Sequence, residues 1–213
     1  MDVLDKLKND WNKNGDRYPK ISENEIYAML HRRSSSIVKW ILLISIIEFA
    51  FFLTLTFMLN DTPSAKSIVE FIGTSLNTVF GAIDMGINLV FMYLFYVNYK
   101  KITNTDTVKN LMSNILKTRK IVSRYIFIKL AYTVVMSLVV LLILYYNDPE
   151  WLATFHNYEE HGKSVQATLV YFIGGIIGVS LIVTVLWLFY KLIYGILLKR
   201  LNKNYQELKK IEI

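Results

Sequence analysis

Four long apolar segments alternate with short polar segments along the 213-residue chain. The apolar segments cover residues 37–59, 79–99, 125–146 and 167–190. Each holds about 20 or more mostly apolar residues, and a helix of that length matches the hydrocarbon thickness of a bilayer, roughly 30 Å. All three prolines lie outside these segments, so each segment is expected to form an uninterrupted helix. The pattern predicts an all-α integral membrane bundle of four transmembrane helices.

The polar segments also carry helical signals. Ser22 followed by Glu25 has the spacing of a capping box, which predicts a juxtamembrane helix that runs on toward the first span. From Thr107 onward, apolar residues recur near helical spacing among basic residues, which predicts an amphipathic helix before the third span. The fourth segment stays apolar past Tyr190 as far as Leu198. Its helix is therefore expected to project beyond the membrane and to pair with the amphipathic helix.

Lys and Arg are distributed unevenly among the polar segments. Their counts are 8 up to Lys39, 1 between the first two spans, 8 in residues 100–129, 1 between the last two spans, and 6 from Lys191 onward. By the positive-inside rule, both termini and the central connection face the cytoplasm. We therefore interpret the net charge of +7 as a topology signal and not as a nucleic-acid-binding surface.

Polarity divides the chain into three regions. Residues 1–36 form a cytoplasmic arm and juxtamembrane helix, residues 37–198 the transmembrane domain, and residues 199–213 a cytoplasmic tail. Within the transmembrane domain, residues 60–78 are expected to hold a short surface helix that leads into the second span. Cysteine is absent, which excludes disulfides, thiolate metal sites and a cysteine nucleophile.

Glu48 lies at the middle of the first apolar segment, where an ionised carboxylate costs on the order of a few kcal/mol. Asp84 and Asn88 are four residues apart on the second segment, so they share one helical face. One hypothesis is that these three residues form a protonatable or cation-binding cluster between helices. The other is that Glu48 is protonated, or hydrogen-bonded to Asn88 or Ser45, and only joins the helices.

Two further kinds of residue within the spans suggest packing roles. Lys129 and Lys191 lie near the cytoplasmic ends of the third and fourth spans, so their side chains are expected to extend to the interface. Small residues four apart form two candidate packing pairs, Gly174 with Gly178 and Ala82 with Gly86. Such pairs allow close helix packing, which we expect within one chain. A homodimer through the fourth span is the alternative.

Basic residues of the cytoplasmic segments form a candidate docking face for anionic lipid headgroups or for a protein partner. They are Arg32, Arg33, Lys117, Arg119, Lys120 and Arg124. The first two also act as the stop signal that precedes the first span.

The outer connection holds His156, Glu159 and His161, which is similar to the zinc-binding pattern H-x-x-E-H. The two histidines are one position too far apart, and Pro149 and Gly162 argue against the long regular helix that such a motif needs. We expect an ordinary solvated loop here. No metal and no other cofactor are predicted.

The stretch EIYAMLHRRSSSIVKWI, residues 25–41, resembles an uncharacterised family of four-span inner-membrane proteins of Bacteroidota-type bacteria. The similarity covers the whole chain and implies a bacterial inner-membrane protein with this topology. Members are often labelled as β-carotene monooxygenases. Such oxygenases hold iron with four histidines, whereas this sequence has three, expected on opposite sides of the membrane. No mechanism follows from the resemblance.

These patterns favour a non-enzymatic integral membrane interaction protein: an adaptor, complex subunit or regulator that presents its basic cytoplasmic face. Its expected partners are the bilayer with anionic headgroups, an unknown membrane or cytoplasmic protein, and in the alternative a second copy, but no nucleic acid. The alternative function is a small proton- or cation-coupled transporter or channel subunit that uses Glu48, Asp84 and Asn88. An enzyme is disfavoured, because the sequence offers no nucleophile, no convincing metal set and no phosphate-cradling loop.

Overall fold

The computed structural model describes residues 22–105 and 107–211, and within these ranges every regular element is a helix. The helices are α2 (Glu23–Leu59), α3 (Pro63–Ile72), α4 (Thr74–Thr103), α5 (Val108–Asn147), α6 (Pro149–Glu160) and α7 (Ser164–Ile211). Four of them, α2, α4, α5 and α7, are long and apolar enough to cross a membrane. The predicted all-α class is confirmed, and the four helices have the length and apolar character that the prediction of four spans requires. Most of the N-terminal arm, residues 1–21, lies outside the described residues.

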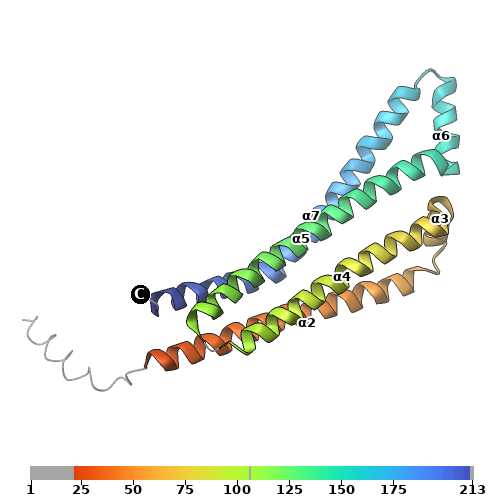
Figure 1. Ribbon diagram of the computed structural model, residues 1–213. Coiled ribbons are helices and arrows are strands. Elements are labelled where there is room, and N and C mark those ends of the chain that lie inside the picture. Colours follow the sequence, from red (N-terminus) through yellow and green to blue (C-terminus); the bar gives the residue numbers. More distant parts are fainter. Residues whose placement is uncertain (1–21, 106, 212–213) are drawn as a thin grey trace, which may run out of the picture.

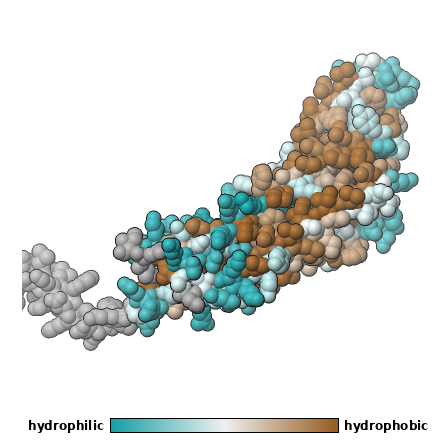
Figure 2. Space-filling view, viewed as in Figure 1, coloured by the Kyte–Doolittle hydropathy of each residue, from teal (hydrophilic) through white to brown (hydrophobic). Residues whose placement is uncertain are grey.

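The four long helices run up and down the same axis (Figure 1). The start of α2, the turn between α4 and α5, and the end of α7 lie at one end of the molecule, whereas α3 and α6 lie at the other. Helix α2 packs along α4, and α5 packs along α7. Figure 2 shows that hydrophilic surface gathers at the first end, which we call the basic end, and that hydrophobic surface covers most of the remaining length on this face.

Short-range signals define where the helices begin. Ser22 forms a complete capping box: its hydroxyl accepts from the Glu25 amide at 3.3 Å, and the Glu25 carboxylate accepts from the Ser22 amide at 2.9 Å. The Thr107 hydroxyl caps α5 by accepting from the Asn110 amide. Gly73 separates α3 from α4 with φ of +86°, a conformation that favours glycine because it has no Cβ. The predicted juxtamembrane, amphipathic and surface helices are all present.

The molecule has two halves that differ in how they are packed. The basic half comprises residues 22–48, 88–105, 107–125 and 190–211, and the far half comprises residues 49–87 and 126–189. On α5, the buried residues of the basic half recur at steps of four and three, as in a coiled coil: Leu111, Ile115, Thr118, Val122 and Tyr125. The contiguous core of the protein, from Leu30 on α2 to Leu208 on α7, lies entirely in this half.

Side chains of the far half are mostly exposed within the chain. Every residue of α2 from Phe51 to Leu59 is exposed, and α7 exposes large apolar residues such as Ile173 and Ile177. The helices fan apart toward α3 and α6 (Figure 1). Apolar side chains at this depth suit contact with lipid tails, which are themselves apolar.

Candidate functional site

Glu48 lies at the boundary between the two halves and is 5% exposed. Three tyrosine hydroxyls donate to its carboxylate. Tyr125 on α5 and Tyr190 on α7 reach Oε1 at 2.8 and 2.7 Å, and Tyr194 on α7 reaches Oε2 at 3.0 Å. We call these four residues the Glu48 cluster. It joins three of the four long helices through one carboxyl group.

Helical spacing places these side chains at one point. Tyr190 and Tyr194 are four residues apart, so both lie on the face of α7 that points to Glu48. Tyr125 continues the buried four-and-three row of α5, and its ring packs edge-on against both other rings at about 6 Å between centroids. The aromatic rings thus exclude water from the carboxylate, while their hydroxyls replace the lost hydrogen bonds.

The cluster also defines how the two helix pairs are aligned along the axis. Glu48 lies at the middle of the first apolar segment, whereas Tyr125 begins the third and Tyr190 ends the fourth. The apolar segments of α5 and α7 are therefore displaced toward the α3 and α6 end by about 11 residues, or roughly 16 Å at 1.5 Å per residue. Glu48 is level with basic residues on the neighbouring pair, such as the exposed Arg124.

A chain of polar contacts continues from the cluster along α4. The Tyr125 hydroxyl also lies 3.4 Å from Asn88 Oδ1, and Asn88 Nδ2 donates to the Asp84 carboxylate at 3.0 Å and to the Asp84 carbonyl at 2.9 Å. Lys129 Nζ pairs with Asp84 Oδ1 at 2.5 Å and is only 11% exposed. The structure therefore brings Glu48, Asp84 and Asn88 into one network, although Glu48 and Asn88 meet only through Tyr125.

Two interpretations of this region differ from the structure. Ser45, one of the two partners considered for Glu48, instead donates its hydroxyl proton to the Leu42 carbonyl at 2.8 Å. Lys129 does not extend to the interface, since it forms the ion pair with Asp84. Lys191, in contrast, is exposed and lies over the ring of Trp187 at 4.4 Å. A lysine can be drawn into a bundle when a carboxylate on the adjacent helix compensates its charge.

Both oxygens of the Glu48 carboxyl have hydroxyl partners, two at Oε1 and one at Oε2. These three hydroxyl groups can satisfy the hydrogen-bonding capacity of the buried group. The Tyr125 hydroxyl has one proton and two acceptors within reach, Glu48 and Asn88, and the shorter distance favours Glu48.

The candidate packing pairs do not lie where the structure brings two helices into close contact. A Cβ added to Gly174, Gly178 or Gly86 would meet nothing within 4 Å, and Ala82 is exposed, so neither pair lies at a close helix contact within the chain. The close contact is at Gly175, where an added Cβ would clash with the Leu141 side chain on α5. Neither pair makes a close helix contact among the described residues, and the homodimer through the fourth span stays a prediction.

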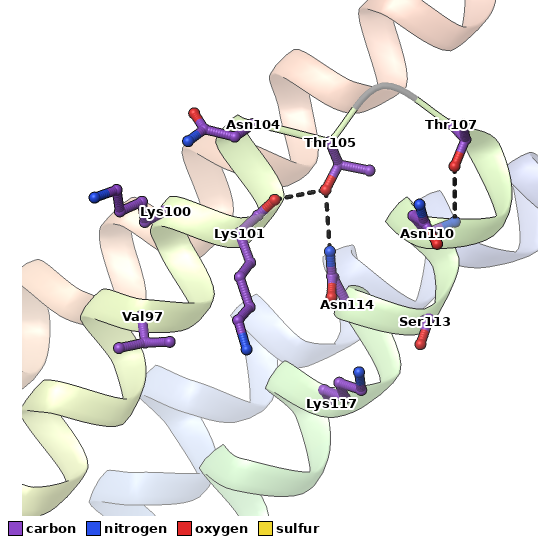
Figure 3. Close-up of a pocket in the computed structure, with 10 residues that line it drawn as sticks. All are labelled: Val97, Lys100, Lys101, Asn104, Thr105, Thr107, Asn110, Ser113, Asn114 and Lys117. Carbon is purple, nitrogen blue, oxygen red and sulfur yellow. Dashed lines mark hydrogen bonds between the residues drawn. The ribbon is translucent and has the colours of Figure 1, made fainter.

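Two basic cavities flank the basic half on different sides. One, about 610 Å³, lies between the end of α4 and the start of α5 and is lined by Lys100, Lys101 and Lys117 (Figure 3). Its turn is closed by the Thr105 hydroxyl, which accepts from Asn114 Nδ2 at 3.0 Å. The other, about 420 Å³, lies between α2 and α7 and is lined by three arginines, Arg32, Arg33 and Arg200.

The remaining candidate docking residues lie on α5. Lys120 and Arg124 are exposed, whereas Arg119 is half-buried because its Nη1 donates to Asn202 Oδ1 on α7 at 2.7 Å. Arg119 therefore joins α5 to α7, as the predicted pairing of these helices requires. Lys117, Lys120 and Arg124 remain available on the surface.

The outer connection is not a loop, because residues Pro149–Glu160 form α6, which includes His156, and His161 follows as the C-cap residue. Pro149 does not prevent this helix, because it occupies the first turn, where its missing N–H needs no partner. Asp148 is the N-cap residue that precedes it. His156 lies 3.5 Å from Glu159 on the exposed surface. Within residues 22–105 and 107–211, no three His, Asp or Glu side chains are grouped to hold a metal ion.

Four helices long and apolar enough to cross a membrane continue into a packed basic half, with a buried carboxyl group at the boundary, and this architecture is typical of a helical membrane protein. The model of the family described as "Domain of unknown function (DUF8845)" matches residues 24–213, and the chain belongs to this family. No curated protein and no solved structure matches the chain. The family assignment covers all described helices and carries no activity.

Proposed function

We propose that the protein is a non-enzymatic membrane interaction protein that docks a partner on its basic half. The observation that carries this proposal is that all four spans continue past their apolar segments and pack into one bundle. A protein that needed only to cross the membrane would not require this extension. Its packed core would hold the exposed basic residues of α5 in fixed positions, as a docking surface requires.

We place the basic half in the cytoplasm of a bacterium, at the inner membrane. The positive-inside rule supports the orientation, and the resemblance of residues 25–41 supports the membrane. Because the sequence has no cysteine, single reporters can be introduced at Ser113 and at Glu160. An impermeant maleimide applied to intact cells should label the Glu160→Cys variant and leave the Ser113→Cys variant unlabelled until the cells are broken. The reverse labelling pattern would show that the basic half lies outside the cytoplasm.

Affinity purification from native membranes in mild detergent, followed by mass spectrometry and a native mass, tests the docking proposal. A stoichiometric partner should be recovered with the wild-type protein and lost with the Lys117→Glu/Lys120→Glu/Arg124→Glu variant. Lys163→Glu, at the other end of the molecule, is the matched control and should retain the partner. A clean homo-oligomer without another protein would overturn the proposal.

A second candidate, a proton- or cation-coupled transporter or channel subunit, has one observation in its favour. The network of Glu48, Asp84 and Lys129 has one negative charge in excess when both carboxyls are ionised, and the Tyr125 hydroxyl can donate to either of two acceptors. Proteoliposome flux should be abolished in the Glu48→Gln variant if this function is correct. The Glu70→Gln variant, with its exposed carboxyl on α3, is the control. Equal flux in both variants would exclude coupling through Glu48.

A further inference from the structure

Two cavities follow one another along the seam between α2 and α7, and their chemistry differs. The first is the arginine-lined cavity, whose remaining wall includes Trp40 and Leu197. The second, about 440 Å³, is almost entirely apolar, with walls formed by residues such as Ile44, Ile47, Phe51, Val185, Phe189 and Ile193. Of the described residues that line it, Glu48 is the one that is ionisable.

The two cavities lie on the same faces of the same helices. Trp40 in the first and Ile44 in the second are four residues apart on α2, and Leu197 and Ile193 are four apart on α7. Residues four apart lie one above the other, roughly 6 Å apart along the axis. The two cavities are therefore neighbours along the seam, and we refer to them together as the α2/α7 groove, which has a cationic end and an apolar end.

The lining of the groove changes from basic to apolar at the level where α2 and α7 change from polar to apolar sequence. The apolar segment of α2 begins at residue 37, and on α7 apolar residues continue past the end of the fourth segment at Tyr190 as far as Leu198, interrupted by Lys191. The arginines therefore lie beyond the apolar residues of both helices, and the apolar cavity lies among them. Asn204 Nδ2 donates to Ser34 Oγ at 3.1 Å, which aligns the two boundaries side by side. Trp40 is exposed at this level, where indole rings favour the membrane interface.

The arginines are suited to a phosphate. Guanidinium groups donate two parallel hydrogen bonds to phosphate oxygens, and none of the three arginines forms an ion pair within the described ranges. Among the residues that the structure describes, no acidic residue lines the first cavity. Glu48 is about 15 residues from Arg33, roughly 22 Å along the helix, and its oxygens already accept from the tyrosines. Its charge is therefore remote from the headgroup position.

We propose that the α2/α7 groove binds one anionic glycerophospholipid, with its phosphate at the arginines and an acyl chain along the apolar cavity. The order of the two cavities along the helices matches the order of headgroup and chain in a bilayer leaflet. The lysine cavity of Figure 3 is basic as well, but most of its lining is polar, with Val97 as its apolar member, so it provides the matched control. The proposal does not depend on the docking function.

Native mass spectrometry of the delipidated full-length protein in detergent, with phosphatidylglycerol or phosphatidylcholine added, tests the headgroup. One phosphatidylglycerol should be retained in preference to phosphatidylcholine. The Arg32→Gln/Arg33→Gln/Arg200→Gln variant should bind it about a hundredfold more weakly. The Lys100→Gln/Lys101→Gln/Lys117→Gln variant, with the same loss of charge, should bind it as the wild type does. Equal weakening by both variants would show unspecific attraction and overturn the proposal.

The chain position is tested with Val185→Phe, which narrows the apolar cavity without touching the arginines. This variant should weaken phosphatidylglycerol binding several-fold and leave the affinity for glycerol 3-phosphate unchanged. Tight binding of glycerol 3-phosphate to the wild type, with no effect of Val185→Phe on the lipid, would identify a soluble-anion site and contradict the lipid assignment. Because both Val185 and the arginines are on the surface of the groove, unchanged thermal unfolding midpoints should accompany these results.

Discussion

The basic half and the far half are built from the same four helices but are held together differently. In the basic half, apolar residues such as Ile115 and Leu201 are fully buried between helices, as in a water-soluble coiled coil. In the far half, residues of similar character, such as Ile177, are exposed within the chain. The hydrophobic effect drives helices together in water, whereas lipid tails give apolar side chains an equivalent environment. Packing between the helices of the chain is therefore concentrated in the basic half, from Glu48 to the basic end, and does not extend along the whole length of the spans.

Substitutions in the Glu48 cluster should have the largest effect on the stability of the basic half. Replacing Glu48 with Leu would leave the Tyr190 and Tyr194 hydroxyls without an acceptor and Tyr125 with only its 3.4 Å contact to Asn88, and each unsatisfied polar group costs about 1–3 kcal/mol. We expect the free energy of unfolding to fall by roughly 3 kcal/mol or more, measured by thermal unfolding in detergent. Glu70→Leu, which removes an exposed carboxyl, should change it little.

A matched pair of truncations tests the core itself. Ile115→Ala removes a side chain that is 0% exposed in the basic half, and such cavities cost about 2–5 kcal/mol. Ile177→Ala removes the same atoms from a residue that is 62% exposed, so a change within about 0.5 kcal/mol is expected. Denaturation of both variants under identical conditions gives the comparison. Equal losses would contradict the division into two halves.

Single hydroxyl deletions should have intermediate effects. Tyr194→Phe removes one donor to a charged acceptor, and hydrogen bonds to charged groups contribute about 1.5–3 kcal/mol. Tyr93→Phe deletes a hydroxyl from a residue of α4 that is 66% exposed and should be neutral. The shift of the unfolding midpoint for Tyr194→Phe relative to Tyr93→Phe measures the contribution of one tyrosine. A neutral Tyr194→Phe would show that Glu48 does not need this donor.

Glycine substitutions on α7 should have the smallest effects on stability. They compare two positions of the far half, one at an open face and one at a contact between helices. Gly178→Ala faces open space and should stabilise the helix by up to about 1 kcal/mol through propensity. Gly175→Ala gains the same propensity but must displace the Leu141 side chain, so it should be less stable than Gly178→Ala. The native mass of Gly178→Ala also tests the homodimer alternative, because loss of a dimer would indicate that this open face is an interface between copies.

Much of the fold could be predicted because its signals are local. Apolar length identified the four spans, the Ser22 and Glu25 spacing gave the start of α2, and the periodicity after Thr107 gave the extension of α5. The helix α6 was missed because Pro149 was interpreted as a helix breaker, although proline is well tolerated in a first helical turn.

The site could be predicted only in part, because its partners depend on the alignment of the helix pairs. Asp84 and Asn88 share a face through local spacing, so their neighbourhood was accessible from the sequence. The contacts of the tyrosines with Glu48 could not be predicted from the sequence. Tyr125 and Tyr190 lie at the ends of apolar segments, where tyrosine is common because it favours the membrane interface. Only the displacement of α5 and α7 along the axis brings them level with Glu48. The spacing of Tyr190 and Tyr194 was the one local signal available.

The most direct test of the account is whether the Glu48 cluster acts as a unit. Thermal unfolding should be compared for Glu48→Leu alone and for the same substitution combined with Tyr125→Phe, Tyr190→Phe and Tyr194→Phe. Because the combined variant leaves no unpaired buried hydroxyl in the cluster, it should recover most of the stability that Glu48→Leu loses. A combined variant whose losses simply add would contradict the claim that the carboxylate and the tyrosines hold the two helix pairs together.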